Sequence, residues 1–318
     1  MEYGFYDRLR ENMPSQIIID IDQNCNYACV HCPHGKFRKS DIYTGARLSE
    51  ELNRKLVDEV REAGNGDVQH LRYTANGEPL LHPHAVEILT YAAQNSGTFV
   101  SLTTNGSLLT KEVSRQLLLS GIGLIDISLD AYHEDTYALI RKNGNLVRVR
   151  QNVLDLLQLR RETNAQTKIV VSYVIQPDNI NEIEDFEKYW MQQGVYQVVF
   201  RKLHTAGGSI KNSSVETDSG EYQPCVYPWE RLSIGPDGEF EFCPASWEGK
   251  MHLGFNIKDH TIYEVWHSDR YRKLREEHLR AAFADFKICG ECPDRNHIIW
   301  PGKDGRKAYG DMIKELKK

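Results

Sequence analysis

The chain has 318 residues, of which 40% are hydrophobic, so it is long enough for one large domain, or a large and a small one, around a buried core. Its 39 basic and 45 acidic residues give a formal net charge of −6, which provides no basic excess for binding nucleic acid. The N-terminus is charged where a secretion signal is apolar, and no apolar run approaches the roughly 18 residues of a membrane span. We therefore expect a cytoplasmic protein without membrane contact, in which the seven cysteines are reduced and serve as metal ligands or catalytic groups.

Strand and helix patterns alternate along the first two thirds of the chain. The expected strands are residues 17–21, 67–74, 99–105, 124–130, 168–175 and 197–203, and the expected helices between them are residues 48–64, 84–96, 111–120, 133–162 and 181–193. Six strands separated by helices imply right-handed crossovers and a parallel sheet, either a partial barrel or a doubly wound sheet. In both folds the functional groups gather at the carboxyl ends of the strands.

The alternation stops after Leu203. Residues 204–224 are rich in Gly, Ser and Thr and have no periodicity, which is typical of a linker or a lid. Residues 230–242 alternate around Pro236-Asp237-Gly238 and predict a hairpin, and a helix is expected over residues 262–284. We therefore expect one domain over residues 1–204 and a second, small domain over residues 205–318.

The cysteines fall into two sets. Cys25, Cys29 and Cys32 follow the first strand with the spacing C-x3-C-x2-C, which suits a [4Fe-4S] cluster with one iron open to a small molecule. Zinc completed by His31 or His34, or plain buried thiols, are the alternatives. Cys225, Cys243, Cys289 and Cys292 form a complete four-thiolate set that suits a structural zinc or a second cluster. The two sets use all seven cysteines, so no thiol is left for catalysis.

The first cysteine motif, placed after the first strand of a six-unit β/α chain, resembles the radical S-adenosylmethionine (SAM) enzymes. The resemblance implies an α/β fold, a partial (β/α)6 barrel like part of a TIM barrel. It also implies a [4Fe-4S] cluster whose open iron is chelated by the amino and carboxylate groups of SAM. Reduction of that cluster, by an external reductant such as flavodoxin or ferredoxin, would cleave SAM to methionine and a 5′-deoxyadenosyl radical.

Other motifs match the SAM site of this family. Asn76-Gly77-Glu78-Pro79 resembles the element that binds the methionine amino group, although Asn76 stands where the family usually has a glycine. His31 occupies the aromatic position near the adenine, and Ser128 and Asp130 match residues that meet the ribose or carboxylate of SAM. Any one of these residues alone could have a purely structural role. The match to the family therefore depends on their occurring together, at the strand ends where the family has them. The SAM-binding residues implied are His31, Gly77, Glu78, Pro79, Asn105, Ser128, Asp130, Arg141 and Gln176.

The C-terminal part is similar to the twitch domain, the shorter relative of SPASM domains. Cys225, the spacing Gly238-x4-Cys243, and the pair Cys289-x2-Cys292 match its pattern, whereas a full SPASM domain needs further cysteines. The resemblance implies a β-hairpin and a helix around one auxiliary [4Fe-4S] cluster with four protein ligands.

A fully ligated auxiliary cluster can accept an electron, which an oxidation requires. The cysteine pattern resembles that of twitch-bearing radical SAM dehydrogenases that act on aminocyclitols in antibiotic biosynthesis. This predicts an oxidoreductase that converts a secondary alcohol of an aminocyclitol or sugar to a ketone. We expect Arg201 to bind the reacting hydroxyl or remove its proton, with His204 as a reserve general base. An ion pair of Arg201 with a surface carboxylate is the alternative interpretation.

Three other functions remain open at this stage. A radical SAM epimerase must return a hydrogen atom, usually from a cysteine, and only tyrosines such as Tyr222 and Tyr227 are available for that role. A peptide-modifying (RiPP) maturase often has a leader-binding module, and only 24 residues precede Cys25. A binding or electron-transfer protein without catalysis would keep the scaffold but would not cleave SAM.

Overall fold

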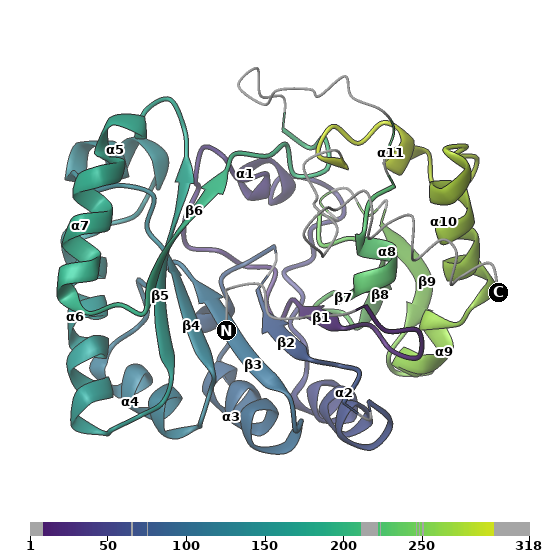
Figure 1. Cartoon of the computed structure of the whole chain (residues 1–318), viewed down its shortest axis with the longest axis horizontal. Helices are drawn as coiled ribbons and strands as arrows, with labels where there is room; N and C mark the ends of the chain where they lie inside the picture. Colours follow the sequence, from purple (N-terminus) through teal and green to yellow (C-terminus); the bar gives the residue numbers. More distant parts are fainter. Residues whose placement is uncertain are drawn as a thin grey trace.

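The structure, a computed structural model, describes residues 9–64, 66–74, 76–210, 222, 224–245, 247, 249 and 251–295. Helices lie along the outer face of a curved sheet, and the C-terminal elements lie at its β1 end (Figure 1). The first six strands are β1 (Gln16–Ile19), β2 (His70–Tyr73), β3 (Phe99–Thr104), β4 (Leu124–Ser128), β5 (Lys168–Ile175) and β6 (Gln197–Lys202). In the described part of the chain, no helix is both long and apolar enough to cross a bilayer.

The strand order distinguishes the two candidate architectures. The six strands stand in the order β6-β5-β4-β3-β2-β1 and all pair in parallel, so each lies beside its predecessor in the chain. A doubly wound sheet would reverse its order at a switch point. The partial barrel is therefore confirmed.

Amphipathic helices cover the outer face. They are α2 (Glu50–Ala63), α3 (Ala85–Asn95), α4 (Lys111–Leu119), α5 (Glu134–Ile140), α6 (Leu146–Glu162) and α7 (Ile183–Gln193). Ser49, Thr110 and Asn145 cap the starts of α2, α4 and α6, each accepting a hydrogen bond from a backbone N–H of the first turn. The helices expected across residues 133–162 are α5 and α6, and they are separated where Asn143 adopts a φ of +70° and Asn145 caps a new start.

The C-terminal segment continues the same sheet. Strand β7 (Arg231–Ile234) pairs in parallel with β1, and β8 (Glu239–Glu241) and β9 (His252–Asn256) follow in antiparallel pairing. The hairpin expected over residues 230–242 is confirmed, and Gly238, with a φ of +86°, forms its turn. The division at residues 204 and 205 stays a prediction, since the sheet spans both parts.

Other C-terminal expectations are corrected in detail. The single helix expected over residues 262–284 is wrong, because Ser268 caps a new helix and separates α9 (Ile262–Trp266) from α10 (Asp269–Arg280). Along the described chain, three short helices and two 3-10 turns were also not predicted from the sequence. They are α1 (His34–Phe37), α8 (Tyr227–Glu230), α11 (Lys287–Gly290), η1 (Pro79–Leu81) and η2 (Ile180–Glu182). In the expected linker, residues 211–221 and 223 lie outside the described residues.

Candidate active site

The loop after β1 brings the first three cysteines together. Burial, together with the nearby Glu78 carboxylate and the Cys29 and Cys32 sulfurs, raises the pKa of the Cys25 thiol to about 12. Burial likewise raises the pKa of Cys32 to about 11, with Cys29 adding to the effect. Three thiolates this close and this buried repel one another, and a cationic metal centre offsets that repulsion.

The two histidines of the zinc alternative face other partners. Nδ1 of His31 lies 3.2 Å from Nε2 of Gln176 and its Nε2 lies 3.5 Å from Asp130, while Nε2 of His34 lies 2.8 Å from the Gln23 carbonyl oxygen. Among the described residues, no group of three His, Cys, Asp or Glu side chains is arranged to hold a single metal ion. The donor set is three thiols, as an iron–sulfur cluster with an open iron requires.

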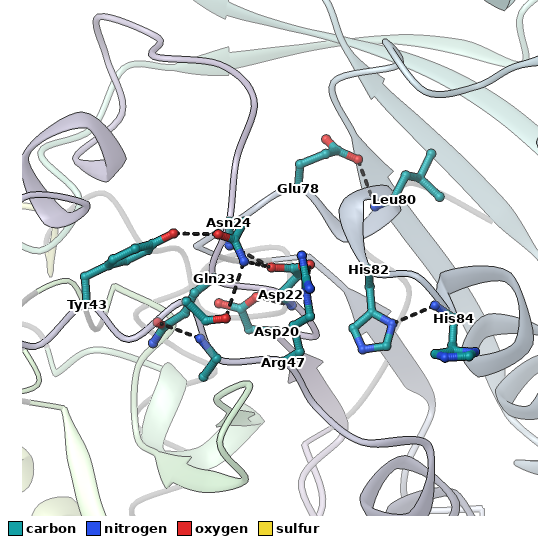
Figure 2. Close-up of polar contacts among 12 residues, drawn as sticks. Asp20, Asp22, Gln23, Asn24, Tyr43, Arg47, Glu78, Leu80, His82 and His84 are labelled. Carbon is teal, nitrogen blue, oxygen red and sulfur yellow. Dashed lines mark hydrogen bonds and ion pairs between the residues drawn. The ribbon is translucent and has the colours of Figure 1, made fainter.

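The start of the cysteine loop is held by residues that follow α1 (Figure 2). The Tyr43 hydroxyl donates to Oδ1 of Asn24 at 2.6 Å, and Nε of Arg47 donates to Oδ2 of Asp22 at 2.8 Å. Oδ1 of Asp22 accepts hydrogen bonds from the backbone N–H and the side-chain amide of Asn24 at 2.8 and 2.6 Å. These contacts fix the backbone immediately before Cys25.

Gly77 allows the loop after β2 to pack on the cysteine loop. The backbone N–H of Glu78 donates to the Asn24 carbonyl oxygen at 2.8 Å. A Cβ atom at Gly77 would lie 1.7 Å from the Asp22 carbonyl oxygen, far inside van der Waals contact. The glycine that the resemblance assigns to SAM binding is therefore required by the approach of two backbone segments.

Replacing Gly77 by alanine is expected to displace the cysteine loop and destabilise the protein by about 1–3 kcal/mol or more. Gly35 is the matched control, because it lies in the neighbouring helix α1 and a Cβ atom there would meet no other atom within 4 Å. Denaturant unfolding and the iron content after anaerobic reconstitution measure the effect. Equal stability and iron content for Gly77→Ala and Gly35→Ala would contradict the packing argument.

Glu78 joins two strand ends. Its carboxylate accepts hydrogen bonds from the Leu80 N–H at 3.1 Å, the Thr104 hydroxyl at 2.6 Å and the Asn105 N–H at 2.7 Å. Burial raises the pKa of Glu78, and these donors act in the opposite direction. The side-chain amide of Asn105 donates to Asn26 in the cysteine loop at 2.8 Å. Glu78 and Asn105 thus position the loop, and Glu78 also caps η1, whose first residue is Pro79.

Four of the predicted SAM-binding residues meet in one buried network beside Cys29. Nε and Nη2 of Arg141 lie 2.7 and 2.5 Å from Oδ2 of Asp130, and Nη1 of Arg141 lies 3.7 Å from the Cys29 sulfur. His31 and Gln176 join this network through the contacts given above. The network links the cysteine loop to the ends of β4 and β5.

Asp130 is the centre of this network. It is fully buried, adopts a φ of +62°, and its Oδ1 accepts the Val174 N–H at 2.7 Å. Burial lowers the pKa of Arg141, but Asp130, Cys29 and Tyr137 together raise it more, and the net shift is upward. Burial lowers the pKa of His31 to about 4, so its ring is neutral at neutral pH. Ser128 precedes Asp130 by two residues and pairs in register with Ser172 of β5.

The other four cysteines converge from separate segments of the chain. Burial raises the pKa of Cys225, and Cys243, Cys289 and Cys292 raise it further. Burial also raises the pKa of Cys243 to about 12. Cys225 precedes α8, Cys243 follows β8, Cys289 lies in α11 and Cys292 follows it. The seven cysteines thus lie in one group of three and one group of four, and their role as cluster ligands stays a prediction.

An aromatic cluster, which was not predicted, packs against Cys32 of the first set and against Ala245, which follows Cys243 by two residues. The Phe37 ring lies 5.7 Å from the Trp247 ring and 5.5 Å from the Tyr43 ring, and the His34 ring lies 6.5 Å from Trp247. The sequence offers little signal for it, because His34 and Phe37 are separated from Trp247 by about two thirds of the chain.

Arg201 lies at the end of β6 and forms an ion pair with a buried carboxylate. Its Nη2 lies 2.8 Å from Oδ2 of Asp126 on β4, and the Arg201 side chain is 32% exposed while that of Asp126 is fully buried. The partner is therefore not the surface carboxylate of the alternative interpretation. Nδ1 of His204 accepts the Ala206 N–H at 3.0 Å. The catalytic roles of Arg201 and His204 remain predictions.

The comparisons with known proteins agree with this geometry. The model of the Radical SAM superfamily matches residues 20–189, and that of the SPASM iron-sulfur cluster-binding domain matches residues 225–293. The chain belongs to the radical SAM superfamily. This radical SAM enzyme therefore uses SAM and [4Fe-4S] clusters, and the resemblance inferred from the cysteine spacings is confirmed.

Two relatives of this radical SAM enzyme are named as enzymes of different reactions. An AdoMet-dependent heme synthase of Methanosarcina barkeri is 24% identical over 96% of this chain and 95% of its own length. A GTP 3′,8-cyclase of Lactiplantibacillus plantarum is 28% identical, and the match covers 76% of this chain and 64% of the cyclase.

Solved structures share the fold. BtrN in complex with AdoMet and 2-DOIA has a TM-score of 0.59 at 18% identity, covering 89% of this chain and 94% of BtrN. Streptococcus suis SuiB bound to precursor peptide SuiA has a TM-score of 0.67 at 15% identity, covering 92% of this chain and 74% of SuiB.

Proposed function

We propose that this radical SAM enzyme oxidises a secondary alcohol of an aminocyclitol or sugar to a ketone, with the auxiliary cluster as electron acceptor. The distribution of the cysteines is the observation that carries the proposal. Three thiols form the first set, four form the second, and the chain has seven in all. No thiol is left to return a hydrogen atom, so the cysteine-dependent route of an epimerase has no donor.

The inner face of the barrel carries polar side chains, which favours a polar substrate. The alternate positions of the strands, such as Ile125 and Ile127 of β4, pack in the hydrophobic core of the outer face. The register therefore directs the other positions to the inner face, where Arg72 pairs with Ser101, Thr103 with Asp126, and Ser128 with Ser172. Nη2 of Arg72 donates to Oγ1 of Thr103 at 3.3 Å. A sugar or cyclitol offers hydroxyl groups to such a surface.

Arg201 is suited to hold the reacting hydroxyl. Val174 pairs with Arg201, which places both residues on the same inner face as Ser172. The ion pair with Asp126 fixes the guanidinium, whose positive charge lowers the pKa of a hydroxyl bound to it. His204 would accept the hydroxyl proton.

The cofactors supply the radical part of this chemistry. When bound, the SAM-binding cluster supplies the 5′-deoxyadenosyl radical that takes a hydrogen atom from the carbinol carbon. The hydroxyl proton and one electron leave in addition, so the product lacks two hydrogen atoms. The His31–Asp130–Arg141–Gln176 network would orient SAM against the first cysteine set.

A coupled assay of SAM cleavage tests the proposal. An aminocyclitol or amino sugar is expected to raise 5′-deoxyadenosine formation above the rate without substrate. Arg201→Gln should reduce this stimulation by about 10²-fold or more while leaving the substrate-free rate unchanged. Arg161→Gln, on the exposed surface of α6, is the control and should change neither rate.

Two results of this assay would contradict parts of the proposal. Stimulation by a peptide or a heme precursor, with none by any cyclitol or sugar, would overturn it and assign the enzyme to another substrate class. Equal stimulation of the wild type and Arg201→Gln would remove Arg201 from the site.

A further inference from the structure

Arg295 lies directly beside the Cys289 and Cys292 pair of the four-cysteine set. Its Nη1 donates hydrogen bonds to the carbonyl oxygens of Cys289 and Gly290, both at 3.1 Å. The backbone N–H of Arg295 donates to the Cys292 sulfur. These contacts hold the guanidinium against the turn of chain that carries two of the four thiols.

The positive charge of Arg295 forms no ion pair with a carboxylate in the described part of the chain. Besides the two carbonyl oxygens, its guanidinium faces the Tyr222 ring, with Cζ 4.6 Å from the ring centroid. The acidic neighbour Asp294 is turned to another segment, because its carboxylate accepts the N–H groups of Thr205 and Gly207, both at 2.7 Å. The charge of Arg295 is therefore free to act on the thiols.

A buried carboxylate, Glu277 of α10, acts on the same thiols in the opposite sense. It accepts hydrogen bonds from the N–H groups of residues 284–286, each at 3.1 Å, and these residues lead into α11, which carries Cys289. Burial and the neighbouring cysteine sulfurs raise the pKa of Cys289, and Arg295 acts against this rise while Glu277 adds to it. Two opposed charges thus flank one part of the four-cysteine set.

The surroundings of Arg295 are poorly solvated. His278 of α10 is only 1% exposed. Burial lowers the pKa of its ring to about 4, and the charge of Arg295 adds to this effect. The ring is therefore neutral at neutral pH and does not change the charge balance. Charges in such a site interact more strongly than they do in water.

We propose that Arg295 raises the reduction potential of the auxiliary cluster at the four cysteines and thereby makes it a better electron acceptor. A cluster that gains an electron becomes more negative, so a nearby cation favours the reduced form and a nearby anion favours the oxidised form. Glu277 therefore opposes Arg295. The inference rests on the electron-acceptor role proposed above, but the potential itself is measured without a substrate.

A redox titration followed by electron paramagnetic resonance tests the role of Arg295. The reconstituted full-length enzyme is titrated with and without SAM, and the signal that SAM leaves unchanged is assigned to the auxiliary cluster. Arg295→Gln removes the positive charge, Arg295→Lys keeps it, and Glu277→Gln removes the opposing charge. Arg280→Gln is the matched control, because Arg280 lies on the same helix as Glu277 and its side chain is 75% exposed.

Arg295→Gln is expected to lower the potential of the auxiliary cluster. The equilibrium constant for its reduction should fall by about 10-fold, which is about 59 mV for one electron. Glu277→Gln should shift the potential in the opposite direction, and Arg295→Lys should recover most of the loss. Arg280→Gln should stay within about 2-fold of the wild type, because water and salt screen an exposed charge. The SAM-sensitive signal of the first cluster should keep its potential in every variant.

Three results would overturn the proposal. One is an unshifted potential in Arg295→Gln, even if the enzyme oxidises an alcohol. The second is an equal shift in Arg295→Lys and Arg295→Gln, and the third is a shift of the same sign in Arg295→Gln and Glu277→Gln, since both indicate a distorted loop instead of a charge effect. If Arg295→Gln loses iron, the sign of the shift in Glu277→Gln decides.

The proposed function and this inference fail separately. Failure of every sugar and cyclitol as a substrate would contradict the proposed function and would leave the measured potentials unaffected.

Discussion

Replacing Cys243 by alanine is expected to leave SAM cleavage intact and to reduce oxidised product to the limit of detection. Cys243 belongs to the four-thiol set, and burial together with the nearby Cys292 sulfur raises the pKa of its thiol. The first set, with Cys25, Cys29 and Cys32, is untouched, so the radical still forms. The substrate radical, however, has no acceptor for its electron. Liquid chromatography with mass detection of 5′-deoxyadenosine and product measures both quantities.

The reciprocal variant is the control for this prediction. Cys25→Ala should abolish SAM cleavage and keep the visible absorbance of the auxiliary cluster. The four thiols join three distant segments of the chain, so their cluster also stabilises the fold. Circular dichroism is therefore needed to check that Cys243→Ala is folded. A folded Cys243→Ala enzyme that still forms product would contradict the electron-acceptor role.

Replacing Asp130 by asparagine is expected to destabilise the protein by about 3–5 kcal/mol, because a buried guanidinium then loses its counter-charge. Arg141 is only 7% exposed and both Nε and Nη2 face Asp130. Asparagine tolerates the positive φ of residue 130, so the loss comes from the charge and not from the backbone. Denaturant unfolding and SAM binding by calorimetry measure the effect, and both should weaken.

Asp58→Asn is the matched control. Asp58 forms an ion pair with Arg61 at 2.7 Å, the two side chains are 36% and 42% exposed, and the hydrogen bond that Asp58 accepts from the Tyr91 hydroxyl can also be accepted by an asparagine oxygen. Its removal should cost less than about 1 kcal/mol. If Asp130→Asn were as stable as Asp58→Asn and bound SAM normally, the network would not be an organising part of the site.

The parts of the fold that were predictable depend on local patterns. The six parallel strands follow from apolar runs separated by amphipathic helices, and the cysteine sets follow from their spacing. The pairing of β7 with β1 was not predictable, because it joins residues 231–234 to residues 16–19 and leaves no periodic signal in either segment. The break between α9 and α10 depends on one capping serine, Ser268, whose hydroxyl competes with helix continuation.

In the site, residue identities were more predictable than their contacts. His31, Asp130, Arg141 and Gln176 meet because they follow strand ends that a barrel brings together, and their role in binding SAM stays a prediction. The hydrogen bonds that the Glu78 carboxylate accepts from Thr104 and Asn105 were not predicted, because side-chain direction at a strand end is set by tertiary packing. The aromatic cluster at Trp247 depends on contacts between segments far apart in the chain.

The mass of the product formed in heavy water tests the central claim most directly. The anaerobically reconstituted enzyme is turned over with SAM, a reductant and a panel of aminocyclitols and amino sugars. Our account predicts a product that lacks two hydrogen atoms, carries no solvent deuterium at carbon, and forms in equal amount with 5′-deoxyadenosine. A product of unchanged connectivity that carries one solvent deuterium would mean epimerisation and would contradict it.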